Sequence, residues 1–161
     1  MLEVISGREY PAKVIPLIEK AVSNIDIVVF DWRWYPQDPG AVCQLFNQAV
    51  LRAARRKVKI RVIANNSVLR AARRKVKIRV IANNDQIIDI LKKEGCQAKR
   101  LRTTKLVHCK LVIIDDQIVV TGSHNFTQSA FQMNLELSVI IGEDVPKHSF
   151  IDFFNNLWSL G

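Results

Sequence analysis

The chain has 161 residues, of which 48% are hydrophobic and 24% are charged. That length suits a single domain with its own core, and that composition excludes a chain that is disordered throughout. Lysine and arginine together number 24 against 15 acidic residues, and the net charge of +9 favours a polyanionic partner, either nucleic acid or an anionic membrane surface.

Membrane-spanning and secretory segments are not expected. No apolar run approaches the roughly 20 residues that a transmembrane helix requires, and residues 1–4 lack the start of a secretory signal. The cysteines are odd in number and show no CxxC spacing, which argues against a disulfide framework or a zinc site; they are Cys43, Cys96 and Cys109. We therefore expect a cytoplasmic protein without stable membrane insertion.

The hydrophobic pattern predicts helices and strands that alternate along the chain. In the N-terminal half it predicts a helix over residues 10–22, a strand over 25–30, a loop over 32–40 and a helix from Ala41. In the C-terminal half it predicts a helix from Asn84 or Asp85 to Gly95, a strand over 105–114, a turn over 115–117, strands over 118–121 and 135–141, and a helix over 146–157. This alternation predicts an α/β fold, with a mixed β-sheet flanked by helices on both faces, in one domain spanning residues 1–161.

One segment of the sequence occurs twice without change. VLRAARRKVKIRVIANN occupies residues 50–66 and again residues 68–84, at a period of 18 residues. Solenoid repeats diverge and need three or more copies to build a core, so we interpret this pair as a recent tandem duplication. Each copy holds six basic residues and no acidic residue, and removal of one copy lowers the net charge from +9 to +3.

Each copy has the pattern of a helix end followed by a strand. Residues 51–55 are good helix formers, and residues 57–62 alternate polar and β-branched side chains. In one arrangement, the first copy extends the preceding helix and the second supplies the strand. In another, both copies form helix–strand units and the sheet gains a strand. We favour an arrangement in which one copy keeps the original place and the other is displaced into helix or loop.

The segment over residues 107–125 carries the residues suited to chemistry. His108 and Lys110 are two apart on a predicted strand, so their side chains share one face. A cation beside an imidazole suits a bound phosphate. Gly122 ends the next strand, where a missing Cβ allows close backbone approach. Asn125 follows as a neutral donor, which we expect beside the N-terminus of a helix.

These residues form a longer pattern of fixed spacing. The pattern His-x-Lys-(x)4-Asp-(x)6-Gly-Ser-x-Asn matches the HKD motif of the phospholipase D superfamily in every defined position, through His108, Lys110, Asp115, Gly122, Ser123 and Asn125. The chain resembles a short, nuclease-like member of that superfamily, with one HKD half-unit per chain. The duplicated segment is its one departure from the family pattern.

The resemblance implies a catalytic role for each of these side chains. His108 is the nucleophile, which takes the phosphoryl group as a phosphohistidine. Lys110 and Asn125 hold non-bridging phosphate oxygens and stabilise the transition state, and Ser123 lines the phosphate pocket. Glu136 accepts the other imidazole N–H and fixes the tautomer.

Two motif residues are expected to be structural, and a second histidine is needed. Asp115 is a turn residue and Gly122 belongs to the backbone of the motif. The chemistry needs one histidine to attack and another to protonate the leaving oxygen, and neither His124 nor His148 sits in a second motif. The resemblance therefore implies an isologous homodimer, with His108 from each chain in one shared site.

The function that the resemblance implies is a metal-independent endonuclease that cleaves DNA or RNA. No carboxylate cluster indicates a two-metal centre, so no metal or cofactor is expected. One alternative is a phospholipid hydrolase, for which we expect an apolar lip or membrane-binding helix that the sequence does not show. Another is a catalytically impaired nucleic-acid-binding module.

Four further side chains near the motif or the first loop have more than one interpretation. His124 fills a variable position of the motif, where it either lines the substrate groove or lies on the surface. Trp32, Trp34 and Tyr35 are interpreted as core or interface aromatics in preference to base-stacking residues.

Overall fold

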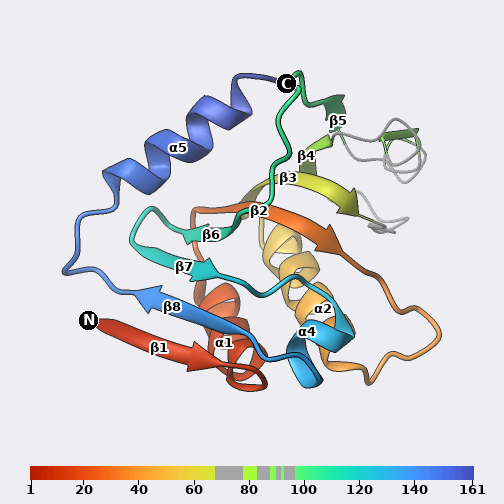
Figure 1. Ribbon diagram of the computed structural model, residues 1–161, viewed down its shortest axis with the longest axis vertical. Helices are drawn as coiled ribbons and strands as arrows, with labels where there is room; N and C mark the ends of the chain where they lie inside the picture. The colour runs from red at the N-terminus through yellow and green to blue at the C-terminus, as the bar shows by residue number, and fades with distance from the viewer. Residues whose placement is uncertain (68–77, 83–87, 90–91, 93–96) are drawn as a thin grey trace.

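The computed structural model describes residues 1–67, 78–82, 88–89, 92 and 97–161. The strands in these ranges form one eight-stranded mixed sheet in the order β1-β8-β7-β6-β2-β3-β4-β5 (Figure 1). In that order, every pair from β1 to β2 is antiparallel and every pair from β2 to β5 is parallel. The strands are β1 (Leu2–Ser6), β2 (Asn24–Trp32), β3 (Lys59–Ser67), β4 (Ile78–Ala82), β5 (Gln97–Arg100), β6 (Lys110–Ile114), β7 (Ile118–Gly122) and β8 (Leu137–Ile141).

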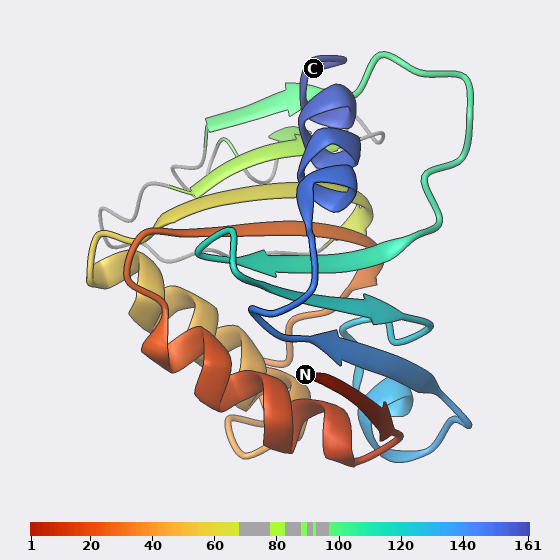
Figure 2. The same cartoon turned by 90° about the vertical axis from the view of Figure 1, so that its left-hand side faces the viewer.

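Helices cover both faces of this sheet (Figure 2). One face carries α1 (Glu9–Lys20), α2 (Val42–Arg55) and the short α4 (Gln128–Gln132), and the other carries α5 (His148–Trp158). The larger hydrophobic cluster lies between the sheet and α1 and α2, and the smaller cluster lies beneath α5. The predicted α/β fold, a mixed sheet with helices on both faces, is confirmed.

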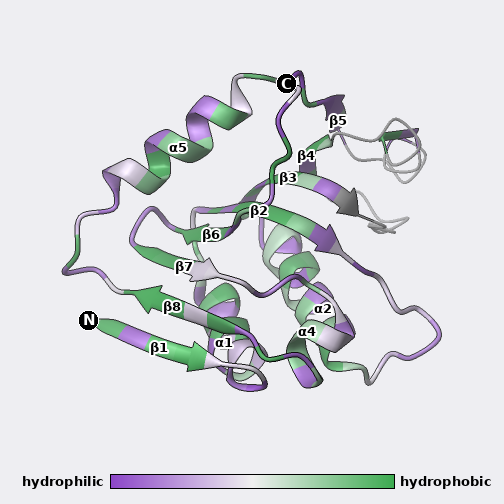
Figure 3. Ribbon diagram, in the orientation of Figure 1, coloured by the Kyte–Doolittle hydropathy of each residue, from purple (hydrophilic) through white to green (hydrophobic). Residues whose placement is uncertain are grey.

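Strand β2 lies at the centre of the sheet and is buried from both sides. Ile25, Ile27 and Val29 belong to the cluster under α1 and α2, whereas Val28 belongs to the cluster under α5. A strand covered on both faces has a nearly continuous apolar sequence, as β2 does. Figure 3 shows this apolar stretch along β2, with hydrophilic residues at its carboxyl end. Polar side chains therefore emerge where the parallel strands end.

Most predicted elements are present, with bounds shifted by a few residues. The helices predicted over residues 10–22 and 146–157 correspond to α1 and α5. The strand predicted over residues 105–114 begins only at Lys110, because residues 101–109 cross the carboxyl ends of β4 and β3. β1 and β5 have no counterpart among the predicted elements, and α4 follows Asn125, where a helix was expected without stated bounds. The helix predicted after the repeat lies mostly outside the described residues.

Both copies of the repeat supply a strand. β3 comes from the first copy and β4 from the second, and each residue lies opposite its own copy, from Ile60↔Ile78 to Ala64↔Ala82. The favoured arrangement, with one copy displaced, is therefore wrong for the strand halves of the repeat. The alternating pattern is equally complete in both copies, and both strands bury their apolar residues. The helical half of the second copy lies within residues 68–77, outside the described residues.

Deletion of residues 67–84 is expected to leave a folded chain whose sheet has one strand fewer. β4 places Arg79 opposite Gln97 of β5, and β3 carries the same side chains as β4 at each equivalent position. After deletion, β5 therefore meets the same side chains on β3. Thermal melting followed by circular dichroism is expected to stay cooperative. Loss of the cooperative transition would show that the second copy is required for folding.

The described cysteines are free thiols, namely Cys43 and Cys109, and Cys96 lies outside the described residues. Burial, and next the nearby Asp31 carboxylate, raise the pKa of Cys43 to about 12. Its neutral thiol lies 3.1 Å from the carbonyl oxygen of Phe126, to which it donates.

Among the helices in the described ranges, none combines the length and the apolar character needed to cross a membrane.

Candidate active site

His108 and Lys110 meet at the start of β6. The Lys110 Nζ lies 3.2 Å from His108 Nδ1 and donates to the His108 carbonyl oxygen at 2.7 Å. Their side chains therefore lie on the same side, while Cys109 and Leu111 pack in the cluster beneath α5. The Phe30 ring of β2 lies against the imidazole, with ring centroids 4.7 Å apart. His108 is exposed, so its ring is open to a substrate.

Lys110 is a cation held mostly out of water. Only 7% of the residue is exposed. Burial lowers the pKa of Lys110, and the nearby Glu136 carboxylate partly opposes that shift. A poorly solvated ammonium attracts an anion more strongly than a solvated one, because less water screens its charge. Lys110 is therefore suited to bind an oxyanion next to His108.

The contact with Lys110 also bears on the tautomer of His108. An ammonium has only donors, so Nδ1 accepts in this contact and the neutral ring carries its proton on Nε2. The expected arrangement is different, with the imidazole N–H donating to Glu136. In the structure, the two Glu136 oxygens accept instead from the Ser123 hydroxyl and from Asn134 Nδ2, the latter at 3.1 Å. The expected Glu136–His108 hydrogen bond is not formed in this chain.

Ser123 and Glu136 tie the motif turn to the start of β8. The Ser123 Oγ accepts from the Leu137 backbone N–H at 3.1 Å, and the Ser123 N–H donates to the Leu137 carbonyl at 2.9 Å. A cavity of about 420 Å³ opens beside them, lined by Ser6, Gly7, Ser123, Asn134, Leu135, Glu136 and Leu137. The Glu136 carboxylate is half-buried in its wall. Ser123 thus faces an open pocket, on the same turn as Asn125.

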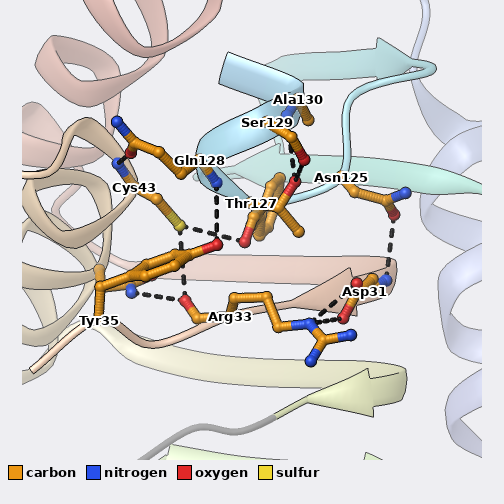
Figure 4. Close-up of polar contacts among 11 residues, drawn as sticks. Asp31, Arg33, Tyr35, Cys43, Asn125, Thr127, Gln128, Ser129 and Ala130 are labelled. Atoms are coloured by element: carbon orange, nitrogen blue, oxygen red, sulfur yellow. Dashed lines mark hydrogen bonds and ion pairs between the residues drawn. The ribbon is translucent and has the colours of Figure 1, made fainter. Parts of the chain in front are cut away.

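Asn125 is oriented by the end of β2. Its Oδ1 accepts from the Asp31 backbone N–H at 3.0 Å, and its amide nitrogen is turned away from that bond (Figure 4). The two segments are further joined by hydrogen bonds between Phe126 N and Asp31 O at 3.0 Å and between Arg33 N and Phe126 O at 2.9 Å. Because Oδ1 is bonded to the backbone, the amide nitrogen of Asn125 remains as the donor for a ligand. The expected helix is α4, which begins three residues later at Gln128.

Strand β2 links the two halves of the site. Phe30 contacts His108, and the next residue, Asp31, holds Asn125. These contacts gather His108, Lys110 and Asn125 at the carboxyl end of β2. In open α/β sheets, ligands bind at such strand ends. Phe30 and Asp31 could not be identified from the sequence, since their roles depend on which strands become neighbours.

Gly122 lies where three strands come close together. It pairs with Lys110 on β6 and with Ser138 on β8. A Cβ at this position would lie 2.2 Å from Ser138 Oγ and 2.3 Å from the Leu137 carbonyl oxygen. Real side chains do not approach so closely, so only glycine fits. The close backbone approach expected at Gly122 is present.

Asp115 stabilises the junction between α1 and β2. Its carboxylate accepts from the backbone N–H groups of Val22, Ser23 and Asn24 at 2.7–3.2 Å, and from the Ser23 hydroxyl at 2.8 Å. Burial tends to raise the pKa of Asp115, but these hydrogen bonds outweigh it and hold the pKa below its ordinary value. The contacts of Asp115 are thus made with the fold and lie away from His108.

Replacing Asp115 with asparagine is expected to destabilise the protein by about 2 kcal/mol at neutral pH, because bonds to a charged acceptor are lost. Asparagine tolerates the left-handed backbone at this position, where φ is 53°. The native carboxyl has a lowered pKa, so its contribution is present above the ordinary pKa of 3.8 and is lost as pH falls through the folded value. Urea denaturation should show the difference at pH 7 and a progressively smaller difference as pH falls below 3.8. A difference that does not depend on pH would contradict this origin.

His124 is a buried structural residue, so neither position expected for it is found. Its ring is fully buried, with Nδ1 2.8 Å from Ser138 Oγ and Nε2 3.1 Å from the Gly7 carbonyl oxygen. Tyr10 packs on it at 4.5 Å between centroids. Burial lowers the pKa of His124, opposed by the Gly7 contact and by Glu136.

The aromatic residues after β2 differ in burial. Trp32 is buried and donates from Nε1 to Asn47 Oδ1 at 2.5 Å, so its role as a core aromatic is confirmed. Trp34 and Tyr35 are partly buried and pack against the same cluster. The Tyr35 hydroxyl accepts from the Gln128 backbone N–H at 3.2 Å, which fixes the start of α4 (Figure 4).

An apolar lip borders the pocket, although none was expected from the sequence. Met133, Leu135 and Leu137 are 78%, 103% and 58% exposed. They alternate with Asn134 and Glu136 along the segment that enters β8. The hydrophobic pattern predicted a strand over residues 135–141, but β8 begins at Leu137, and the apolar side chains of the lip are exposed beside the pocket.

The comparisons with known proteins agree with this fold and motif. The family model for the "Cardiolipin synthase, PLD-like domain" matches residues 14–158. Human mitochondrial cardiolipin hydrolase is 32% identical over 71 residues, which cover 44% of this chain and 28% of the relative. Phospholipase D of Rickettsia conorii is 31% identical over 122 residues, covering 76% of this chain and 55% of the relative. The chain thus spans about half of the length of these relatives, or less.

Solved structures extend the likeness over the whole chain. Nuc from Salmonella typhimurium, a phospholipase D family member, superposes with a TM-score of 0.70 at 21% identity, over 100% of this chain and 95% of its own. NucT from Helicobacter pylori superposes with a TM-score of 0.68 at 19% identity, over 99% of this chain and 96% of its own. The chain belongs to the phospholipase D superfamily, whose members are phosphodiesterases.

Proposed function

We propose that the protein is a metal-independent endonuclease that cleaves DNA or RNA through a phosphohistidine at His108. The observation that carries this proposal is the gathering of His108, Lys110 and Asn125 at the carboxyl end of β2. One nucleophile and two sets of donors then surround the place of a single phosphate. The full-length fold likeness to Nuc and NucT favours a compact nuclease.

In the proposed reaction, a phosphodiester oxygen takes the place of His108 Nδ1 as the acceptor for Lys110. Asn125 Nδ2 donates to a second oxygen. The unprotonated ring nitrogen of His108 then forms a P–N bond while the P–O bond to the leaving group breaks, and the leaving oxygen takes a proton from a second imidazole. The second imidazole, now neutral, takes a proton from water as the water oxygen attacks phosphorus; the P–N bond breaks, which releases the phosphate product and restores both imidazoles.

A second copy of the chain is proposed to supply the second imidazole. The other described histidines are unsuited, since His124 is buried among Ser138, Gly7 and Tyr10, and His148 lies on α5, on the opposite face of the sheet from α1, α2 and α4. An isologous dimer brings two His108 rings to one two-fold axis. In that dimer, rearrangement of Glu136 from Ser123 toward His108 lets the carboxylate accept the imidazole N–H, which leaves the other ring nitrogen unprotonated and free to attack.

The apolar lip favours phospholipid hydrolysis as a second candidate function. Exposed apolar side chains beside a phosphate site suit acyl chains, and relatives of the chain are named cardiolipin hydrolase and phospholipase D. The reaction at His108 is the same for both substrates. The candidates differ in what surrounds the phosphate, so a comparison of substrates separates them.

The test is a cleavage assay in EDTA with supercoiled plasmid, a single-stranded oligonucleotide and cardiolipin vesicles as parallel substrates. The endonuclease proposal expects nicking and oligonucleotide cleavage, with little turnover of the vesicles. Lipid turnover without DNA or RNA cleavage would favour the second candidate and overturn the first. Loss of all activity in EDTA would contradict the metal-independent mechanism, and sedimentation showing an active monomer would contradict the shared site. Nucleic-acid binding with no turnover of any substrate would indicate a catalytically impaired module.

A further inference from the structure

A basic strap crosses the carboxyl ends of the parallel strands and leads to the candidate nucleophile, His108. This strap, residues 99–109, begins with the last two residues of β5 and then runs across the carboxyl ends of the parallel strands before β6 begins (Figure 2). The Leu101 N–H donates to the Ala82 carbonyl of β4 at 2.8 Å, and Asn65 Nδ2 of β3 donates to the Val107 carbonyl at 2.9 Å. These bonds fix the path of the strap.

The strap concentrates positive charge at the carboxyl ends of the parallel strands. Lys99, Arg100, Arg102 and Lys105 lie within seven residues that include no acidic residue, and all four are exposed. Within the described residues, no carboxylate lies within ion-pair distance of Arg102 or Lys105. An open cavity of about 480 Å³ lies here, lined by residues 100–105 and Leu160.

The first copy of the repeat places its charges differently, and part of its charge is neutralised. Arg52 and Arg56 pair with Glu19, and Arg61 pairs with Asp26. Lys59 begins β3, at the amino ends of the parallel strands and so opposite the candidate site. The excess charge of the duplicated sequence therefore says little about the site, whereas Arg102 and Lys105 of the strap lie on the path toward it without a carboxylate partner among the described residues.

The length of the strap fits a polymer better than a single headgroup. Arg102 and His108 are six residues apart, a span of at most about 20 Å. A nucleic-acid strand rises only about 3.4 Å per nucleotide along a helix, so it presents several phosphates over that span. A phospholipid bound at His108 presents its phosphates near the site alone.

We infer that the strap binds the sugar–phosphate backbone of a polynucleotide on one side of the scissile bond, with Arg102 and Lys105 as its phosphate contacts. This inference rests on the proposed nuclease function. The threonine hydroxyls between the two cations supply neutral donors to the same backbone. Because phosphate contacts carry no base information, the strap contributes affinity and register without sequence preference.

The test compares two double variants that each remove two positive charges. Arg102→Ala/Lys105→Ala alters the strap, and Lys20→Ala/Arg55→Ala removes two exposed cations at the ends of α1 and α2. Binding to an oligonucleotide of about 20 nucleotides is measured by fluorescence anisotropy over a range of salt concentrations. The strap variant is expected to reduce the slope of log K against log salt by about 1.4–1.8, while the matched control changes it little. Equal slopes in the two variants would overturn the inference.

Two small substrates separate this inference from the function on which it rests. Turnover of bis(p-nitrophenyl) phosphate is expected to be unchanged in the strap variant, because that substrate does not reach Arg102. Cleavage of a trinucleotide is expected to be reduced less in the strap variant than cleavage of the long oligonucleotide. Wild-type cleavage of oligonucleotides with no deficit in the strap variant would overturn the inference alone. Hydrolysis of the small phosphodiester without any binding of nucleic acid would overturn the nuclease proposal as well. If the strap variant binds cardiolipin vesicles more weakly but binds nucleic acid as the wild type does, the strap is a lipid-binding segment.

Discussion

Replacing His108 with alanine is expected to lower phosphodiester cleavage by roughly 10⁴-fold or more, because the proposed P–N bond has no other nucleophile. The imidazole is exposed, so its removal creates no core cavity and the melting temperature should change little. Initial rates with an oligonucleotide and with bis(p-nitrophenyl) phosphate measure the effect. Both substrates should be affected equally, since the loss is in the chemical step.

The matched control is His148→Ala. His148 is also exposed, but it begins α5 on the other face of the sheet. This variant is expected to keep wild-type rates. Residual cleavage by His108→Ala within about tenfold of wild type would show that another group attacks phosphorus. Trapping of a phosphorylated protein in wild type and not in the variant would connect the rate loss to the proposed intermediate.

Replacing Gly122 with alanine is expected to cost about 3 kcal/mol of stability, near the upper end for overpacking, and to reduce cleavage as well. The added Cβ meets the Ser138 side chain at 2.2 Å and the Leu137 backbone at 2.3 Å, and the latter cannot rotate away. β7 and β8 must therefore separate. Because Ser123 and Asn125 follow on the same turn, their positions shift with the backbone. Urea denaturation measures the stability loss.

Gly40→Ala provides the control for this substitution. A Cβ at Gly40 has a single neighbour within 4 Å, the Asp38 Oδ1 at 3.8 Å. The expected change in the free energy of unfolding is within about 1 kcal/mol, with no effect on activity. Equal stability of the two alanine variants would show that β7 and β8 adapt more readily than this packing implies.

The residues of the candidate site could be selected from the sequence because they stand at fixed spacing in one short segment. His108 and Lys110 are two apart, so strand geometry alone puts their side chains on one face. The partner of each residue was harder to predict. Asn125 is held by Asp31, which is 94 residues away, and no local pattern reports that contact. The same holds for Asp115 and the N–H groups that follow α1.

Two errors have the same physical origin. No apolar lip was expected, yet Leu135 faces solvent, because this part of the chain borders the pocket and is not covered by another element. His124 is polar, which suggested exposure, yet Ser138 and the Gly7 carbonyl satisfy both of its nitrogens in the core. In both cases tertiary partners decide burial, and single-residue polarity does not contain that information.

The pairing of β3 with β4 bears on how the sheet changes over evolutionary time. An inserted copy leaves β2 and β5 beside the same side chains as before, so gain and loss of the unit are nearly equivalent steps. The register also sets Arg61 beside Arg79, a pair of like charges that costs stability. Arg61 is neutralised by Asp26, and the Arg79 guanidinium lies 5.6 Å from the Trp158 ring centroid, where the aromatic face attracts it. The number of strands on one side of β2 can thus change, while the strands that carry the motif on the other side stay unchanged.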